Sequence, residues 1–201
     1  MKQIKRLKRE KVSLFLAAAV LSLGILSGCG GESKEAKEAR MTGIEQLNAG
    51  NYQDAIDSFG KALDESDGIV NSFELDVLKY RGEAEYKLAD YKAAAQTYGI
   101  LTEVDGGKAE YLYYKAASEA AAGQAEDAEK DFAAAEEKAK NSKKSSAAAP
   151  GVSLAFTALA SAARDAGDSE LAAQYCNQAI ERGVSGPEIY NQLAISEMEA
   201  G

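Results

Sequence analysis

One spacing of small and larger residues recurs along the sequence and constrains the fold more than any other feature. An alanine is followed four positions later by an aromatic residue or a cysteine, and three positions further by another apolar residue. A small residue precedes each of these alanines by twelve positions. Spacings of three, four and seven place side chains on one face of a helix, so the pattern predicts repeated helical hairpins. The four sets are Gly43, Ala55, Phe59 and Ala62; Gly82, Ala94, Tyr98 and Leu101; Ala116, Ala128, Phe132 and Ala135; and Ala160, Ala172, Cys176 and Ala179.

The period behind this pattern is 34 residues. Equivalent alanines lie 39, 34 and 44 positions apart, and polar, turn-rich segments at residues 66–72 and 141–149 account for the two longer steps. Ala194 then follows Ala160 by 34 positions. The sequence therefore predicts four helical hairpins and the first helix of a fifth.

These residues resemble the tetratricopeptide repeat (TPR), a helix-turn-helix unit of 34 residues, and the resemblance covers residues 36–201. Aromatic residues make up only 7% of the chain, so Phe59, Tyr98 and Phe132 in one slot are the most specific part of the match. The family also carries a large aromatic residue early in its first helix, which is present only in the last two units here. That position holds Ala39, Leu78, Leu112, Phe156 and Tyr190. The resemblance implies an all-α, right-handed TPR-like solenoid of about four and a half repeats.

The first 28 residues have the composition of an export signal. Six Lys and Arg residues crowd the first eleven positions, and residues 12–26 then form an uncharged apolar run of fifteen. Such a run is shorter than the roughly 20 residues that a membrane-spanning helix needs. A basic stretch, a short apolar run and small residues at a boundary are typical of a cleaved signal peptide. The alternatives are an uncleaved signal anchor and a plain secretory signal.

The boundary Leu26-Ser27-Gly28-Cys29 resembles the lipobox of bacterial lipoproteins. The resemblance implies that the thiol of Cys29 receives a diacylglycerol, that residues 1–28 are removed, and that the new amino terminus is acylated as well. Two or more acyl chains hold a protein durably on a bilayer. Residues 29–35 then form a polar tether, and residues 36–201 form the TPR repeat domain. We expect a protein of the bacterial cell envelope, anchored to a membrane, with its repeat domain on the extracytoplasmic side.

Charge and composition exclude several functions. After residue 28 the chain carries 17 basic and 31 acidic residues, a formal net charge of −14, which repels phosphate backbones and excludes nucleic acid as a partner. The sequence contains no His, the commonest general base and metal ligand. Its only cysteines are Cys29 and Cys176, so acylation of Cys29 leaves Cys176 without an intramolecular disulfide partner. We expect no catalytic residue, no metal and no cofactor.

In the TPR family the first helices line the inner face of the superhelix and form an extended groove. The resemblance implies that this groove binds a protein or peptide. Tyr86 and Tyr113 are the candidate anchors, because aromatic residues dominate binding hot spots. The alternative is that these two rings pack between repeats. The candidate groove residues are Lys37, Arg40, Ile44, Leu47, Lys79, Glu83, Tyr86, Tyr113, Thr157 and Arg164.

The expected function is therefore that of a non-enzymatic, membrane-anchored scaffold lipoprotein. One alternative is that the chain is the N-terminal part of a larger exported protein with a downstream catalytic domain. It is motivated by the last predicted helix, whose apolar face has no partner helix before Gly201. Another alternative is a subunit of an envelope assembly machine.

Overall fold

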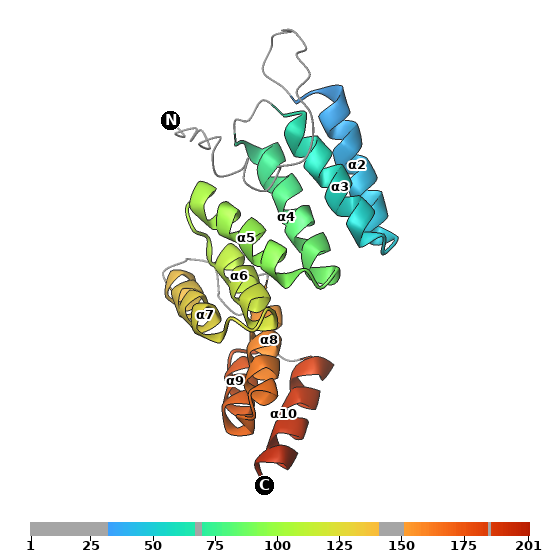
Figure 1. Cartoon of the computed structure of the whole chain (residues 1–201). Coiled ribbons are helices and arrows are strands. Elements are labelled where there is room, and N and C mark those ends of the chain that lie inside the picture. The colour runs from blue at the N-terminus through green and yellow to red at the C-terminus, as the bar shows by residue number, and fades with distance from the viewer. Residues whose placement is uncertain (1–31, 67–69, 141–150, 185) are drawn as a thin grey trace. The chain divides into compact units, whose positions relative to one another are not determined.

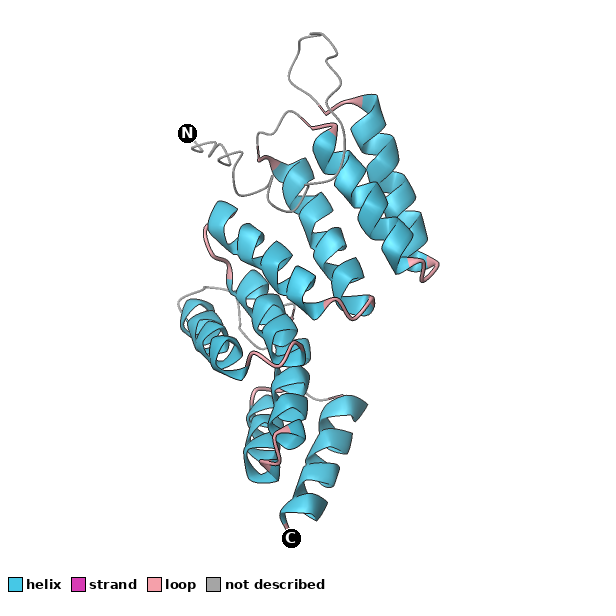
Figure 2. Ribbon diagram, in the orientation of Figure 1, coloured by secondary structure: helices cyan, strands magenta, loops and turns pink. Residues whose placement is uncertain are grey.

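The computed structural model describes residues 32–66, 70–140, 151–184 and 186–201, and every regular element in these ranges is an α-helix (Figure 2). The prediction of an all-helical chain is confirmed for this part of the sequence. The predicted signal peptide, Cys29 and the loop at residues 141–149 lie outside the described residues. The chain divides into two compact units, Met1–Arg81 and Gly82–Gly201, and helix α4 (Ser72–Lys87) contributes to both.

The first unit contains α2 (Lys34–Asn48), α3 (Tyr52–Asp64) and the beginning of α4. Helices α2 and α3 lie side by side and antiparallel, as a hairpin (Figure 1). Phe59 of α3 is fully buried, and its ring lies where Gly43 of α2 has no side chain. The spacing predicted a helical hairpin here, and a small residue lets the two helix backbones approach at their crossing.

The second unit also consists of successive helices that pack side by side. It contains α5 (Tyr91–Val104), α6 (Ala109–Ala121), α7 (Ala125–Lys140), α8 (Val152–Asp165), α9 (Ser169–Glu181) and α10 (Pro187–Ala200). Each helix from α5 to α7 packs on the next, as do α8, α9 and α10, and α6 also packs on α8 (Figure 1). Contact between α6 and α8 stacks one hairpin on the next, and such sequential packing is compatible with an α-solenoid.

The turns inside the four hairpins share one backbone conformation. Gly50, Gly123 and Gly167 have φ of 80°, 76° and 83°, and Ala89 holds the same place with φ of 65°. Glycine is favoured in this left-handed region because it has no Cβ. The equivalent turn positions thus adopt the same shape even where the sequence places alanine.

Polar side chains cap several helix starts. The side chains of Ser33, Asp90 and Asp168 each accept a hydrogen bond from the backbone N–H three residues later, at 2.9, 3.2 and 2.9 Å. At the start of α4, Glu74 Oε2 accepts from the Asn71 N–H at 3.0 Å, and Asn71 Oδ1 accepts from the Phe73 N–H at 2.6 Å. These bonds satisfy N–H groups that have no partner within the helix.

Aromatic rings form the centre of the second unit. The ring of Phe132 contacts those of Tyr113, Phe156 and Tyr175, with centroids 5.7, 4.9 and 6.5 Å apart. These rings come from four helices, α6 to α9. Alanines fill the remaining space, because short side chains let the helices pack closely around the rings.

Candidate interaction surface

Four of the candidate groove residues in the first unit lie on the surface or partly exposed, and one of them, Arg40, forms an ion pair with the neighbouring first helix, α4. Lys37 is exposed, whereas Ile44 and Lys79 are half-buried. Arg40 of α2 donates from Nε to Asp76 Oδ2 of α4 at 2.7 Å, and its guanidinium lies 5.7 Å from the centre of the Tyr80 ring. The α2–α4 pair therefore presents a mixed surface in which Arg40 is already engaged by a carboxylate.

Leu47, predicted to line the same groove, is buried. The helical register places it one turn beyond Ile44, where it packs into the interior instead of facing solvent. It offers no surface to a partner, and we leave it out of the interaction surface.

In the second unit, Glu83 and Tyr86 lie on the last turns of α4. Glu83 is exposed, while Tyr86 is half-buried against the core, with its ring edge-on to Tyr91 at 5.1 Å. Burial, together with the neighbouring Tyr91, raises the pKa of the Tyr86 phenol to about 12. Tyr86 therefore presents a neutral, partly exposed ring.

Tyr113, the other predicted anchor, is fully buried and lies in the core. Its hydroxyl donates to Glu136 Oε1 of α7 at 2.6 Å, and the same carboxylate is held by both terminal nitrogens of Arg182, which follows α9. Burial is the main cause that raises the pKa of Tyr113, and the Glu136 carboxylate adds to it. The contact of α6 with α8 covers this face, so Tyr113 packs between hairpins, as the alternative interpretation predicted.

Thr157 and Arg164 of α8 are half-buried and lie on the first helix of the fourth hairpin. The Thr157 hydroxyl donates to the Ser153 carbonyl at 3.0 Å, and Arg164 donates to Gln192 Oε1 of α10 at 2.5 Å. Arg164 thus bridges two successive first helices, as Arg40 does in the first unit. Both residues keep part of their surface open to solvent.

A polar contact that the sequence analysis missed joins the two helices of each of the first three hairpins. Ser58 donates to Gln46 at 2.7 Å, and Thr97 donates to Glu85 at 2.6 Å. In the third hairpin the equivalent residues are Glu119 and Asp131, which is twelve positions after Glu119. Lys115 forms ion pairs with both of them. The signal in the sequence is a pair of polar residues twelve positions apart across the turn. In the fourth hairpin the equivalent positions hold Ala163 and Tyr175.

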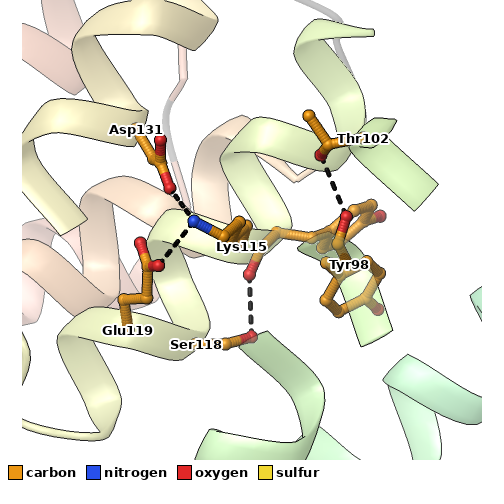
Figure 3. A network of polar contacts seen from close by, with 7 residues as sticks. Tyr98, Thr102, Lys115, Ser118, Glu119 and Asp131 are labelled. Atoms are coloured by element: carbon orange, nitrogen blue, oxygen red, sulfur yellow. Dashed lines mark hydrogen bonds and ion pairs between the residues drawn. The ribbon is translucent and has the colours of Figure 1, made fainter. Parts of the chain in front are cut away.

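Lys115 is the centre of the most extensive of these contacts (Figure 3). Its ammonium pairs with Glu119 Oε1 at 2.7 Å and with Asp131 Oδ2. Glu119 Oε2 is buried and has no hydrogen-bond partner among the described residues. Beside this cluster the rings of Tyr98 and Tyr114 stack with centroids 5.0 Å apart.

The charges in this cluster are strongly interdependent. Burial raises the pKa of Glu119, Lys115 opposes that rise, and Asp131 adds to it. Burial lowers the pKa of Lys115, but the two carboxylates raise it more, so the net change is upward. A lysine acts as a nucleophile only as the neutral amine, whereas this environment stabilises the ammonium. The cluster is suited to holding α6 against α7.

We expect the substitution Glu119→Gln to change how stability depends on pH. A folded-state pKa raised above the ordinary 4.5 means that the folded chain binds more protons above pH 4.5, so wild-type stability falls as pH rises through the raised value. The amide of the substituted glutamine does not titrate. The urea midpoint of the variant, relative to wild type, should therefore rise between pH 4.5 and neutrality.

The control for this measurement is Glu126→Gln, the same charge change at an exposed position of α7. Circular dichroism at each pH monitors the unfolding transition of both variants. A relative midpoint for Glu119→Gln that stays flat or falls with pH contradicts the assigned electrostatics.

Within the described ranges, no set of three or more His, Cys, Asp and Glu side chains is arranged to hold a metal ion. No helix in that part of the chain is both long and apolar enough to cross a bilayer. The thiol of Cys176 is buried in α9, and burial raises its pKa, which disfavours the reactive thiolate.

Comparison with known proteins adds no family assignment. No protein-family model matches the chain, and no curated protein matches it significantly in sequence.

Proposed function

We propose that this chain is a non-enzymatic TPR lipoprotein that is anchored to the outer face of a bacterial membrane and binds a protein or peptide. The observation that carries the repeat assignment is the contact between a small residue and the aromatic residue 16 positions later. A Cβ on Gly43 would lie 2.6 Å from Phe59 Cε1, and one on Gly82 would lie 2.8 Å from Tyr98 Cζ. TPR units depend on this close crossing of their two helices.

The first helices of each unit form an interaction surface. In the first unit it contains Lys37, Arg40, Ile44 and Lys79, and in the second it contains Glu83, Tyr86, Thr157 and Arg164. The first unit combines basic groups with the apolar Ile44, and the second combines charges of both signs with the half-buried ring of Tyr86. A surface of this kind recognises a partner by complementary charge around an apolar contact.

The proposed anchor supports this function by confining the search for partners to the membrane plane. The basic stretch, the apolar run and the Leu26-Ser27-Gly28-Cys29 boundary are the features that favour it. Acylation at Cys29 fixes where the repeat domain works, whereas the first helices determine what it binds.

Photo-crosslinking in the native membrane tests the interaction surface. A photoreactive amino acid at Lys37 or Glu83 should give a covalent adduct with the partner, because both side chains are exposed on first helices. The control position is Lys130, which is exposed on the second helix α7. Equal adducts from Lys130, or none from Lys37 and Glu83, would reject the surface.

The anchor has its own expected result. The variant Cys29→Ala should lack the acyl mass in intact-protein mass spectrometry and should move from the membrane fraction to the aqueous fraction. A variant that remains in the membrane argues instead for an uncleaved signal anchor.

A further inference from the structure

Tyr98 of α5 is a tyrosine in a core position that phenylalanine fills in two other hairpins. The equivalent residues are Phe59 and Phe132, and all three are buried. Phenylalanine packs this position without a hydroxyl, so the phenol oxygen of Tyr98 is not needed to fill the space. A Cβ on Gly82 of α4 would lie 2.8 Å from Tyr98 Cζ, the carbon that carries the hydroxyl. The hydroxyl therefore lies at the crossing of α4 and α5.

The Tyr98 hydroxyl has no hydrogen-bond partner among the described residues, although Tyr98 is only 4% exposed. Two other buried tyrosines, Tyr111 and Tyr113, donate from their hydroxyls to carboxylates at 2.7 and 2.6 Å. In the described ranges the fully enclosed side-chain oxygens without a partner belong to Glu74 and Glu119, so the Tyr98 oxygen keeps an opening to solvent. A nearly buried hydroxyl that the chain leaves unpaired is a group that a ligand can pair.

Carboxylates from two first helices lie near this hydroxyl. Glu83 of α4 is exposed, and Glu110, in the first turn of α6, is half-buried. Burial is the main cause that raises the pKa of Tyr98, and Tyr114, Glu83, Glu85 and Glu110 each add to it. The phenol is therefore neutral, and the carboxylates lie close enough to act on it.

Tyr114 of α6 adds a second hydroxyl to this group. Its ring stacks on that of Tyr98 with centroids 5.0 Å apart, and its hydroxyl is likewise unpaired within the described part of the chain. Burial, followed by Glu110 and Glu83, raises its pKa. Helices α4, α5 and α6 thus bring together two neutral hydroxyls and two carboxylates, all within the second unit.

Basic residues close by in the sequence do not neutralise these carboxylates. Lys115 follows Tyr114, but its ammonium points to the two carboxylates that hold α6 against α7 (Figure 3). Lys87 pairs with one oxygen of Glu83 at 3.7 Å, and both side chains are exposed, so water screens this contact. Glu110 has no ion-pair partner in the described ranges. The group therefore favours a positively charged hydrogen-bond donor and repels an anion.

We propose that Tyr98, Tyr114, Glu83 and Glu110 form a site for the terminal ammonium of a lysine in a peptide segment of the partner. The ammonium has three hydrogens to donate, and the site offers it acceptors from three helices. The planar fork of arginine instead matches a single carboxylate. This inference rests on the proposed function as a protein-binding module, and it names the side chain that the second unit recognises.

Fluorine NMR of the full chain labelled with 3-fluorotyrosine tests the site. The probe is the capped tripeptide acetyl-Gly-Lys-Gly-amide, and the control peptide carries norleucine, an uncharged side chain of similar length. The resonances of Tyr98 and Tyr114, assigned with Tyr→Phe variants, should shift in a saturable way with the Lys peptide. We expect a Kd of about 1–10 mM for that peptide and binding at least about tenfold weaker for the norleucine peptide. Added salt should weaken the binding of the Lys peptide.

Two variants with matched controls locate the site. Tyr98→Phe keeps the ring that this core position accepts elsewhere, so it should fold and should weaken Lys-peptide binding at least about fivefold. Tyr175→Phe removes a hydroxyl that donates to Glu129 at 3.2 Å and should leave binding unchanged. Glu83→Gln should also weaken binding at least about fivefold, whereas Glu126→Gln, at an exposed position of α7, should not. Circular dichroism checks the fold of each variant.

Several results would overturn the proposal. These are equal binding of the two peptides, absence of Lys-peptide binding up to about 100 mM, and equal effects of Tyr98→Phe and Tyr175→Phe. Loss of binding in Glu126→Gln as large as in Glu83→Gln would reduce the effect to overall charge and would also overturn it. The photo-crosslink at Lys37 involves none of these residues. Its loss therefore bears on the proposed function, whereas failure of the Lys peptide bears on this inference alone.

Discussion

Replacing Gly43 with alanine is expected to lower the free energy of unfolding by about 1–2 kcal/mol. Overpacking a core costs about 1–3 kcal/mol, and the better helix propensity of alanine offsets up to about 1 kcal/mol of that cost. The new Cβ would lie 2.6 Å from Phe59 Cε1 and 2.8 Å from Cδ1. The Phe59 ring is fully buried and stacks on Tyr80 with centroids 5.9 Å apart, so it has no free space to move into.

Gly60 provides a control of opposite sign on helix α3. A Cβ built there meets no atom within 4 Å, so Gly60→Ala should raise stability by about 0.5–1 kcal/mol through helix propensity alone. Urea denaturation followed by circular dichroism measures both changes. The double variant Gly43→Ala, Phe59→Leu should recover part of the loss, because a smaller side chain then faces the new methyl group. If Gly43→Ala stabilises the chain as Gly60→Ala does, the close crossing of α2 and α3 is refuted.

The sequence was sufficient to locate this crossing because its constraint is local and steric. A helix crossing that admits no Cβ forces glycine or alanine at one position, and the space it leaves is filled from the other helix at a fixed distance along the chain. The crossings at Gly43 with Phe59 and at Gly82 with Tyr98 can therefore be recognised from the spacing of these residues in the sequence. The helix bounds follow from the same register and from the capping residues.

The candidate surface was harder to predict, because exposure depends on which hairpin packs where. Tyr113 occupies a register position that the resemblance assigns to the groove, yet contact between α6 and α8 buries it. Tyr86, which the resemblance also assigns to the groove, is half-buried on α4. Local periodicity gives the face of a helix, but the packing of the next hairpin determines how much of that face remains open.

The polar pairs across the hairpins were missed for a different reason. Gln46 with Ser58 and Glu85 with Thr97 are ordinary polar residues in a chain that is 27% charged, so no single position stands out. Only their common separation of twelve residues distinguishes them. Glu85 is nonetheless buried, which shows that the helix interfaces are not defined by apolar spacing alone.

Phe156→Ala is expected to have the largest effect of the substitutions considered, a loss of about 3–5 kcal/mol in the free energy of unfolding. Truncating a buried Phe removes its transfer free energy and leaves a cavity. Phe156 is only 1% exposed, and its ring lies edge-on to Phe132 at 4.9 Å, in the aromatic cluster that joins helices α6 to α9. Removing the ring therefore weakens several helix contacts together.

Tyr190→Ala is the matched control, because Tyr190 lies on α10 at the predicted period of 34 residues after Phe156. Its exposure of 51% leaves little burial to lose, so its cost should stay below about 1 kcal/mol. Urea denaturation gives both values. Amide hydrogen exchange shows whether the Phe156→Ala loss spreads through α6 to α9, as it should where these helices pack on one another. A Tyr190→Ala loss as large as that of Phe156→Ala would mean that the Tyr190 ring is buried in solution, because only a buried ring can account for a cost of that size.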